Sequence, residues 1–124
     1  MLGNEDPDVS VPGEILIKKA GFYDYEAKYV EGGMELVAPA PIRDEITQEI
    51  RRIASTAYEA IDAAGMARVD FFLERGTDRL LLNEINTIPG FTPTSVYAEL
   101  WAASGLPYEE LLDRLIQLAL QRHG

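Results

Sequence analysis

Five residues between positions 68 and 90 have the side chains and the spacing that a phosphate or metal site needs: Arg68, Asp70, Glu84, Asn86 and Gly90. The two carboxylates and the amide offer hard oxygen ligands, which suit Mg²⁺ shared with substrate phosphates. An arginine beside them would cover negative charge on a phosphoryl or tetrahedral centre. A glycine in a Pro-Gly loop would let a backbone N–H approach a substrate closely. The pattern favours metal-assisted phosphate chemistry over the chemistry of an isolated carboxylate pair.

Two predicted strands must position these residues. The first run places four apolar side chains on one face of a strand. They are Ala67, Val69, Phe71 and Leu73. A polar turn follows at residues 74–78, with Gly76 where a positive φ is easiest. We predict an antiparallel hairpin in which Phe72 lies opposite Leu82.

This register places Asp70 opposite Glu84 and Arg68 opposite Asn86, and directly opposed residues share a face of the sheet. Strict alternation also predicts that Leu82 shares the face of Glu84, and a slip of one residue would break the whole arrangement. An alternative interpretation is that these are solvated residues on the open face of a sheet, with Arg68 paired to one of the carboxylates.

Composition excludes several classes of function. The chain has 124 residues, 47% of them hydrophobic, which is enough for one modest domain with a core. The formal net charge is −10, so the chain is a poor binder of nucleic acid or anionic membranes. It has no cysteine, which excludes thiol chemistry and fits a reducing cytoplasm. No apolar run is long enough to cross a bilayer, and the acidic start is no signal peptide.

Hydrophobic spacing predicts three helices. The clearest runs from Asp44, as N-cap, to Ala64, with Gly65 as its stop. Its expected buried stripe is Ile46, Ile50, Ile53, Ala54, Ala57 and Ile61. A second helix begins near Thr94 or Ser95 and ends before Gly105. It should bury Val96, Leu100 and Trp101.

The last helix runs from Pro107 to about Gln121. Its expected inner side is Leu111, Leu112, Leu115, Leu118 and Ala119. Before the helices, residues 15–17 read as a short buried strand, and residues 27–30 and 35–38 as strands that pair or form edge segments. The order predicts an α+β fold, a largely antiparallel sheet packed by helices.

Other residues admit two interpretations each. If a helix starts at Ser95, its free N–H groups suit a carboxylate, although an ordinary N-cap fits as well. Lys28 could reach a phosphate or be a surface lysine beside a core Tyr29. Phe22 belongs to an aromatic run that could wall a base pocket or anchor a loop. His123, near a chain end, receives no role.

Three runs, in order, resemble the D-alanine–D-alanine ligases, which are ATP-grasp enzymes. They are FYDYEAKY (residues 22–29), ARVDFFL (67–73) and LNEINTIPGFTPTS (82–95). The segment LGNEDPDVSVPGEI (2–15) resembles the lead-in strand of the same family. The resemblance implies the carboxy-terminal part of an ATP-grasp domain. It further implies that ATP phosphorylates one D-alanine, that the amine of a second attacks the acyl phosphate, and that the dipeptide enters peptidoglycan precursor synthesis.

Roles follow for particular residues by resemblance. Asp70, Glu84 and Asn86 would bind two Mg²⁺ ions (Mn²⁺ as a substitute) that bridge the phosphates of ATP. Arg68 and the Gly90 N–H would stabilise the tetrahedral intermediate.

The resemblance assigns the remaining site residues to the substrates. Ser95 and Val96 would hold the carboxylate of the second D-alanine. Lys28 would approach the terminal phosphate and Phe22 the nucleotide. Tyr29 belongs to a loop that closes over the site, and the Lys-Tyr pairing favours a dipeptide over a depsipeptide product.

The resemblance also concerns extent, because chains of this family are far longer. We therefore interpret residues 1–124 as a carboxy-terminal portion, one domain made of strands and loops (1–43), a helix (44–65), the metal-site hairpin with the substrate loop (66–95) and helices (96–124). We expect this chain alone to be inactive and to self-associate through apolar surface, as a homodimer or a chain-exchanged form. The alternatives are another ATP-grasp carboxylate–amine ligase or a non-catalytic interaction domain.

Overall fold

The computed structural model of the protein describes residues 1–17 and 34–123. Phe22, Lys28 and Tyr29, and the strand predicted at 27–30, lie outside the described residues. The elements within them are β1 (Glu14–Ile17), β2 (Met34–Val37), α2 (Asp44–Ala60), β3 (Arg68–Leu73), β4 (Leu80–Asn86), α3 (Val96–Ala103) and α4 (Tyr108–His123). The strands pair as two separate antiparallel hairpins, β1 with β2 and β3 with β4, so the predicted α+β class is right but the sheet is divided.

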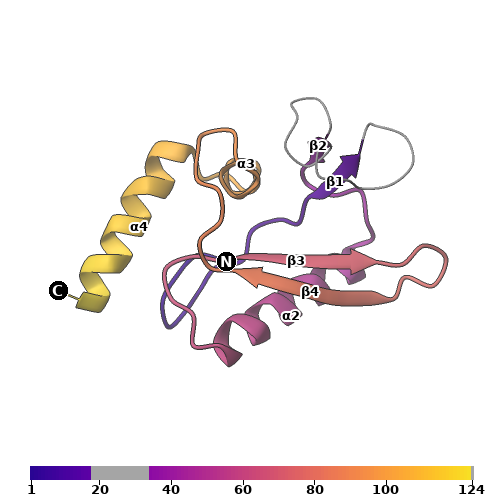
Figure 1. Ribbon diagram of the computed structural model, residues 1–124, viewed down its shortest axis with the longest axis horizontal. Helices are drawn as coiled ribbons and strands as arrows, with labels where there is room; N and C mark the ends of the chain where they lie inside the picture. The colour runs from indigo at the N-terminus through magenta and orange to yellow at the C-terminus, as the bar shows by residue number, and fades with distance from the viewer. Residues whose placement is uncertain (18–33, 124) are drawn as a thin grey trace.

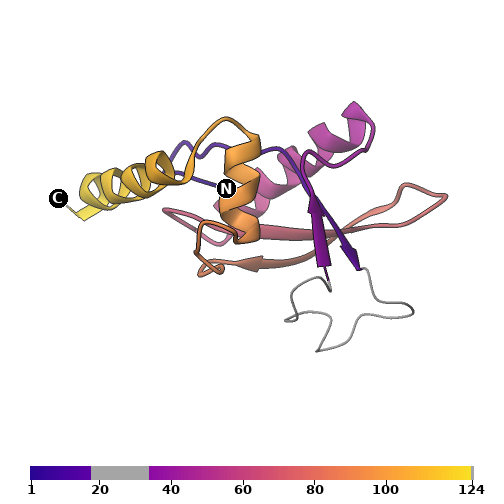
Figure 2. The same cartoon turned by 90° about the horizontal axis from the view of Figure 1, so that it is seen from above.

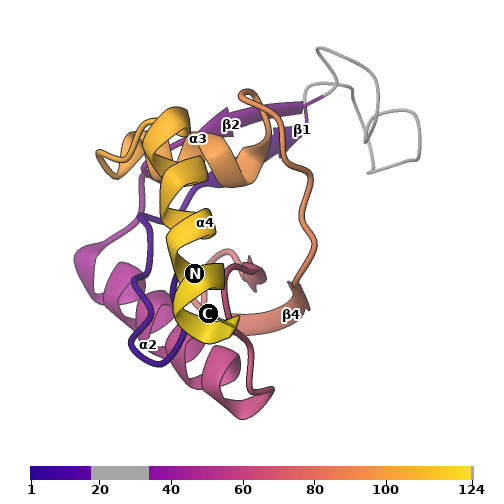
Figure 3. The ribbon, with the colours of Figure 1, turned by 90° about the vertical axis from the view of Figure 1, so that its left-hand side faces the viewer.

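The elements form two tiers joined at one side by α4. The long β3–β4 hairpin and α2 make one tier, and α3 with the β1–β2 hairpin makes the other (Figures 1 and 3). Seen from above, α3 lies between α4 and β1–β2 (Figure 2). The amino-terminal residues run between the tiers: Leu2 bridges antiparallel to both Asp8 and Met66.

Helix α2 is shorter than its sequence pattern predicted. Asp44 is its first helical residue and Arg43 the N-cap, so the predicted cap is wrong by one position. An acidic first turn, Asp44 and Glu45, still suits the positive end of the helix dipole. The helix ends at Ala60 because Asp62 takes a left-handed φ of 55°, well before Gly65. Ile61 therefore leaves the stripe and is 52% exposed, and α2 buries Ile46, Ala54 and Tyr58.

The β3–β4 register confirms the predicted functional pairs and corrects the apolar end of the hairpin. Asp70 lies opposite Glu84 and Arg68 opposite Asn86. The register then shifts by one residue, so Phe72 faces Leu81 and the predicted Phe72–Leu82 pair is wrong. Asn83 is the extra residue of this bulge, and an extra residue reverses the alternation beyond it.

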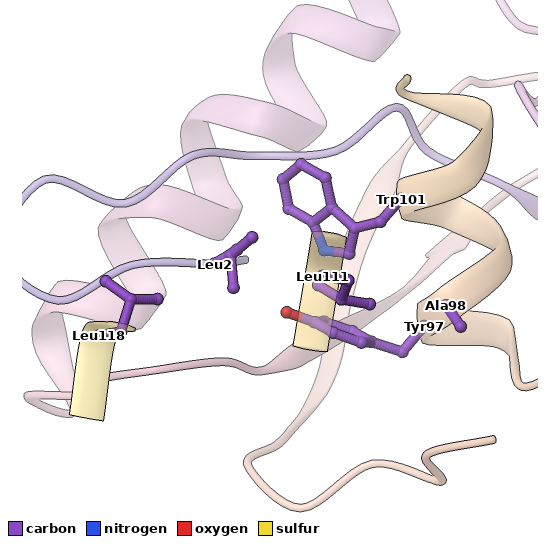
Figure 4. Close-up of a cluster of buried hydrophobic side chains, with 6 residues drawn as sticks. All are labelled: Leu2, Tyr97, Ala98, Trp101, Leu111 and Leu118. Carbon is purple, nitrogen blue, oxygen red and sulfur yellow. The ribbon is translucent and has the colours of Figure 1, made fainter. Parts of the chain in front are cut away.

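The core of the molecule is two clusters that share the amino-terminal residues. In one cluster, side chains of α3 and α4 pack around Leu2 near the amino terminus (Figure 4). Its members are Leu2, Tyr97, Ala98, Trp101, Leu111 and Leu118. The other is Met1, Ala54, Tyr58 and Ala67, between α2 and β3. The phenol of Tyr97 donates to the Met1 carbonyl (2.7 Å) and that of Tyr58 to the Gly3 carbonyl (2.7 Å).

The inner faces of α3 and α4 agree with the prediction only in part. In α3 the predicted Trp101 is buried, but Val96 and Leu100 are half-buried, and Tyr97 and Ala98 are buried in their place. In α4 the predicted Leu111 and Leu118 are buried, whereas Leu112 and Ala119 are exposed. Spacing alone did not separate the two apolar sides of α4, since both have helical periodicity.

The predicted strand at residues 15–17 exists but is not buried. Ile15 and Leu16, which point to opposite faces, are 40% and 39% exposed. β2 pairs with β1, ending at the Ile17–Met34 pair.

Candidate functional site

Packing decides which face of the β3–β4 hairpin is open. Val69, Phe71 and Ile85 pack against the cluster that contains Ala54 and Tyr58 of α2. Because side chains alternate along a strand, the residues between them point away from α2. The four polar residues predicted for the site therefore lie together on the uncovered face.

An ion pair organises this charged face. Arg68 donates to both oxygens of Asp70, from Nε to Oδ1 at 2.9 Å and from Nη2 to Oδ2 at 3.0 Å. Its Nη2 also lies 3.9 Å from Oε1 of Glu84. The side chains of Arg68 and Asp70 are 26% and 29% exposed, against 59% for Glu84. The ion pair between Arg68 and a carboxylate, which the interpretation as a solvated sheet face predicted, is therefore present. Its two parallel hydrogen bonds also fix the plane of the guanidinium.

The oxygen donors fit a metal shared with a substrate better than a closed protein cage. Among residues 1–17 and 34–123, no group of three or more His, Cys, Asp or Glu side chains is placed to hold a metal ion. Two carboxylates face each other across the hairpin, and the Asn86 Oδ1 accepts a bond from the Ile88 N–H (3.0 Å). Mg²⁺ is usually bound by one or two carboxylates, with waters and phosphate oxygens completing its octahedron. Asp70 and Glu84 meet that requirement.

The loop after β4 brings the predicted Gly90 close to the predicted Ser95. A Cβ on Gly90 would lie 3.6 Å from Ser95 Oγ, while Pro89 beside it is buried. Ser95 is the N-cap of α3 by position, yet its hydroxyl makes no cap bond. Instead Ser95 Oγ accepts from the Thr92 N–H (2.8 Å) and bonds to the Thr92 hydroxyl (2.8 Å). The first N–H groups of α3, beginning at Val96, are thus not satisfied by the serine.

A cavity of about 370 Å³ lies between the β1–β2 hairpin and the start of α3. Its lining is Ile15, Met34, Glu35, Leu36, Thr94, Val96 and Glu99. Gly13 sets the approach of its two walls, since a Cβ there would lie 2.7 Å from both Leu100 Cδ2 and Leu36 Cδ1. Of the predicted site residues, Val96 faces this cavity, which sequence reasoning did not foresee.

Sequence reasoning also missed an apolar surface beside the charged residues. Phe72, 59% exposed, and its partner Leu81, 39% exposed, share the open face of Asp70. The signal was available for Phe72, which has the same strand parity as Arg68 and Asp70. It was not available for Leu81, because the bulge at Asn83 alters the parity of β4.

In the described part of the chain, no helix combines the length and the apolarity needed to span a bilayer.

Comparison with known proteins identifies the family of the chain. Residues 1–117 match the family model described as D-ala D-ala ligase C-terminus. The D-alanine–D-alanine ligase of Thermoanaerobacter sp. (strain X514) is 53% identical over 125 residues, which is 100% of this chain and 34% of that protein. That of Geobacillus thermodenitrificans is 53% identical over 124 residues, 99% of this chain and 33% of that protein.

Solved structures share both the fold and the sequence. The D-alanine–D-alanine ligase of Coxiella burnetii superposes with a TM-score of 0.80 at 40% identity, covering 98% of this chain and 30% of that one. The VanG D-Ala:D-Ser ligase of Enterococcus faecalis gives 0.79 at 37% identity, covering 94% and 34%. This chain spans about a third of the length of these relatives. By its sequence and its fold, the chain belongs to the family of D-alanine–D-alanine ligase carboxy-terminal regions.

Proposed function

We propose that this chain supplies the metal-binding and acceptor-binding side of an ATP-dependent ligase that joins two D-alanines through an acyl phosphate. The observation that carries the proposal is the cross-strand juxtaposition of Asp70 with Glu84 and of Arg68 with Asn86 on the open face of one hairpin. The substrates in this proposal are taken from the relatives, which are named D-alanine–D-alanine ligase. In the same proposal the chain is one domain of the ATP-grasp type and works in the cytoplasm, in peptidoglycan precursor synthesis.

The open face has the two kinds of surface that a bound nucleotide requires. Phe72 and Leu81 give an apolar surface at one end, which suits a base. Asp70, Glu84 and Asn86 lie beside it and would hold Mg²⁺ on the phosphates. When bound, the metal would neutralise charge on the transferring phosphoryl group.

The remaining roles belong to this chain's own groups. Arg68, held in plane by Asp70, would face the negative charge of the tetrahedral intermediate, together with the Gly90 N–H. Ser95 and the amino end of α3 would take the carboxylate of the second amino acid. The proposal assigns Lys28 to the terminal phosphate, Phe22 to the nucleotide and Tyr29 to the loop over the site, three residues outside the described part of the chain.

A chimera tests the proposal in a complete enzyme. The corresponding third of the Thermoanaerobacter ligase would be replaced by this chain, and D-alanine-dependent phosphate release and dipeptide formation would be measured. We expect activity, and we expect Asp70→Asn to reduce kcat by about a hundredfold or more, since it removes a metal-ligand charge. Asp78→Asn is the matched control, because Asp78 lies in the turn of the same hairpin and its carboxylate forms an exposed ion pair with Arg43 (2.8 Å). Equal activity of the two variants would refute the proposed site.

The second candidate is a ligase with a different acceptor, which the 37% identity to a D-Ala:D-Ser ligase favours. The chimera offered D-alanine, D-serine and D-lactate separates the acceptors by kcat/KM. The highest value for D-alanine supports the dipeptide assignment, and a preference for another acceptor replaces it.

Alone, the chain should release no phosphate from ATP and D-alanine, because it carries one side of the site. NMR titration of the isolated chain with Mg²⁺ and ATP then distinguishes a retained site from an interaction domain. Shifts at Asp70, Glu84 and Asn86 support the enzyme-derived site. Turnover by the isolated chain would contradict the expectation of inactivity.

A further inference from the structure

A second cavity, of about 230 Å³, lies where the last turns of α4 face the loop between α2 and β3 (Figure 3). Its walls come from α4, from Ala64 and Gly65 of that loop, and from Asn4 near the amino terminus. None of these residues belongs to the proposed ligase site. A cavity of about 150 Å³ can hold a benzene ring, so this one has room for a small organic molecule.

Asn4 joins the two walls of this cavity. Its Nδ2 donates to the Leu118 carbonyl (2.9 Å), and its Oδ1 accepts from the Gly65 N–H (3.1 Å). Both polar atoms of the Asn4 side chain are therefore used within the protein. A ligand must find its hydrogen-bond partners among the other residues of the lining.

Two basic side chains, Arg122 and His123, supply those partners. Across the described part of the chain, neither side chain forms a hydrogen bond or an ion pair. None of the described residues that line the cavity is acidic, although the chain has 21 Asp and Glu residues against 11 Lys and Arg. The cavity is therefore an electropositive site on an acidic protein.

The charge of Arg122 lies near the wall that contains Asn4. Burial raises the pKa of Tyr58 to about 12, and the positive charge of Arg122 acts against that rise. The Tyr58 phenol donates to the carbonyl of Gly3, which precedes Asn4 in the chain (2.7 Å). The helix dipole also favours basic residues in a last turn, but it does not account for a cavity beside them.

We propose that this cavity binds a small monocarboxylate with an aliphatic body. Arg122 and His123 hold the carboxylate, since a guanidinium matches a carboxylate with two parallel hydrogen bonds. The hydrocarbon lies against the apolar part of the lining, which is Leu115, Leu118 and Ala119 of α4. Inorganic phosphate has no apolar part to fill this space.

The charge of the lining also separates this site from the acceptor site of the proposed ligase. A zwitterionic amino acid such as D-alanine would bring its ammonium group beside Arg122, with no acidic partner among the described lining residues. The ligand is therefore an anion without an amino group. This inference does not depend on the ligase reaction.

NMR titration of the 124-residue chain with sodium butyrate, at neutral pH and constant ionic strength, is the test. We expect saturable shifts of the Gly65 and Ala119 amide signals, with a Kd on the order of 1–10 mM, because so small a ligand gains limited binding free energy. Butyramide, the neutral analogue, and D-alanine should each bind about tenfold more weakly or worse.

Two variants locate the site. Arg122→Gln should weaken butyrate binding by about tenfold or more, through the loss of the charged hydrogen bonds. Arg75→Gln is the matched control, because Arg75 is exposed in the turn of the β3–β4 hairpin and its loss changes the net charge equally. Ala119→Leu should abolish binding, because the larger side chain occupies the cavity without a change of charge. Arg75, Ala119 and Arg122 are all exposed, and circular dichroism melts establish that the variants fold.

The outcomes that contradict the proposal are distinct. No saturable shift up to about 100 mM butyrate would overturn the site. Equal binding of butyramide or D-alanine would overturn the ligand class. Unchanged binding to Arg122→Gln or Ala119→Leu, or an equal loss in Arg75→Gln, would overturn the location in this cavity.

Discussion

The two hairpins have the same antiparallel pairing and a helix beside each, but only one shares a core with its helix. β3–β4 is fixed to α2 through Tyr58 and Ala54, and to the amino terminus through Ala67. β1–β2 leaves Ile15 and Leu16 about 40% exposed and encloses a cavity against α3. The packed hairpin carries the charged residues Arg68, Asp70 and Glu84, and the loosely packed one borders the cavity.

The two hairpins therefore differ in what their packing provides: β3–β4 holds side chains in fixed positions, and β1–β2 leaves a cavity. An ion pair as well aligned as that of Arg68 with Asp70 needs a backbone that does not shift, which core packing provides. A cavity forms where side chains do not fill the gap between two elements. Gly13 lets Leu36 and Leu100 approach its backbone closely, since a Cβ there would lie 2.7 Å from each of them. Four predictions test the difference, in order of expected effect.

Truncating Tyr58 should have the largest effect. Tyr58→Ala removes a ring that is 1% exposed and a hydrogen bond to the Gly3 carbonyl, so the free energy of unfolding should fall by about 3–5 kcal/mol. Leu16→Ala in β1 should cost about 1 kcal/mol, because Leu16 is 39% exposed. Urea unfolding of both variants measures the contrast. Equal losses would mean that β1–β2 is as firmly packed as β3–β4.

The amino terminus should make the stability of the packed hairpin depend on pH. Burial lowers the pKa of the Met1 amino group to about 5, where it donates to the Ala67 carbonyl (2.9 Å). In the unfolded chain its pKa is near 8, so between these values the unfolded chain binds more protons. The free energy of unfolding should therefore rise as the pH is raised from about 5 to about 8, by up to about 4 kcal/mol.

Urea unfolding across this pH range measures the slope. A chain extended by two residues before Met1 is the control, because its Met1 nitrogen is a neutral amide and should lose this contribution. The same slope in both chains would show that other groups cause it.

Gly13→Ala should disturb the looser hairpin by about 1–2 kcal/mol, since the new Cβ meets two leucine methyl groups at 2.7 Å and these side chains must rotate. Combining it with Leu36→Val and Leu100→Val removes both methyl ends. A thermodynamic cycle by urea unfolding, in which the two leucine substitutions count as one change, should show favourable coupling with Gly13→Ala. Strictly additive costs would mean that Gly13 does not set this contact.

Asn86→Ala should cost least, about 1 kcal/mol, through the lost bond from the Ile88 N–H. Asn86→Asp keeps an acceptor oxygen and should retain the stability. In the chimera, kcat separates the roles: if Asn86 is a metal ligand, the aspartate variant should keep more activity than the alanine variant. If neither variant changes kcat, Asn86 is not a metal ligand, and its role is limited to the hydrogen bond with the Ile88 N–H.

The sequence was sufficient for the parts of the site that follow from alternation and local chemistry. The pairs Asp70–Glu84 and Arg68–Asn86 and the turn at Gly76, with a φ of 85°, follow from period-two patterning and glycine conformation. Helix signals predict the starts of α3 and α4 to within two residues. The four runs at residues 2–15, 22–29, 67–73 and 82–95, taken in order, were sufficient for the family. Within each run or strand, the signal comes from residues close together in the chain.

Tertiary structure decided what depends on residues far apart. The bulge at Asn83 exchanged the faces of Leu81 and Leu82, and local alternation has no means of showing an unpaired residue. Packing against Leu2 selected Tyr97, Ala98 and Trp101, not Val96 and Leu100, as the inner face of α3, because both sets have helical spacing. The cavity between α3 and β1–β2 is lined by residues from both ends of the chain, such as Ile15 and Val96, so only the folded structure reveals it. Spacing determined which residues share a face, and packing determined which faces remained open.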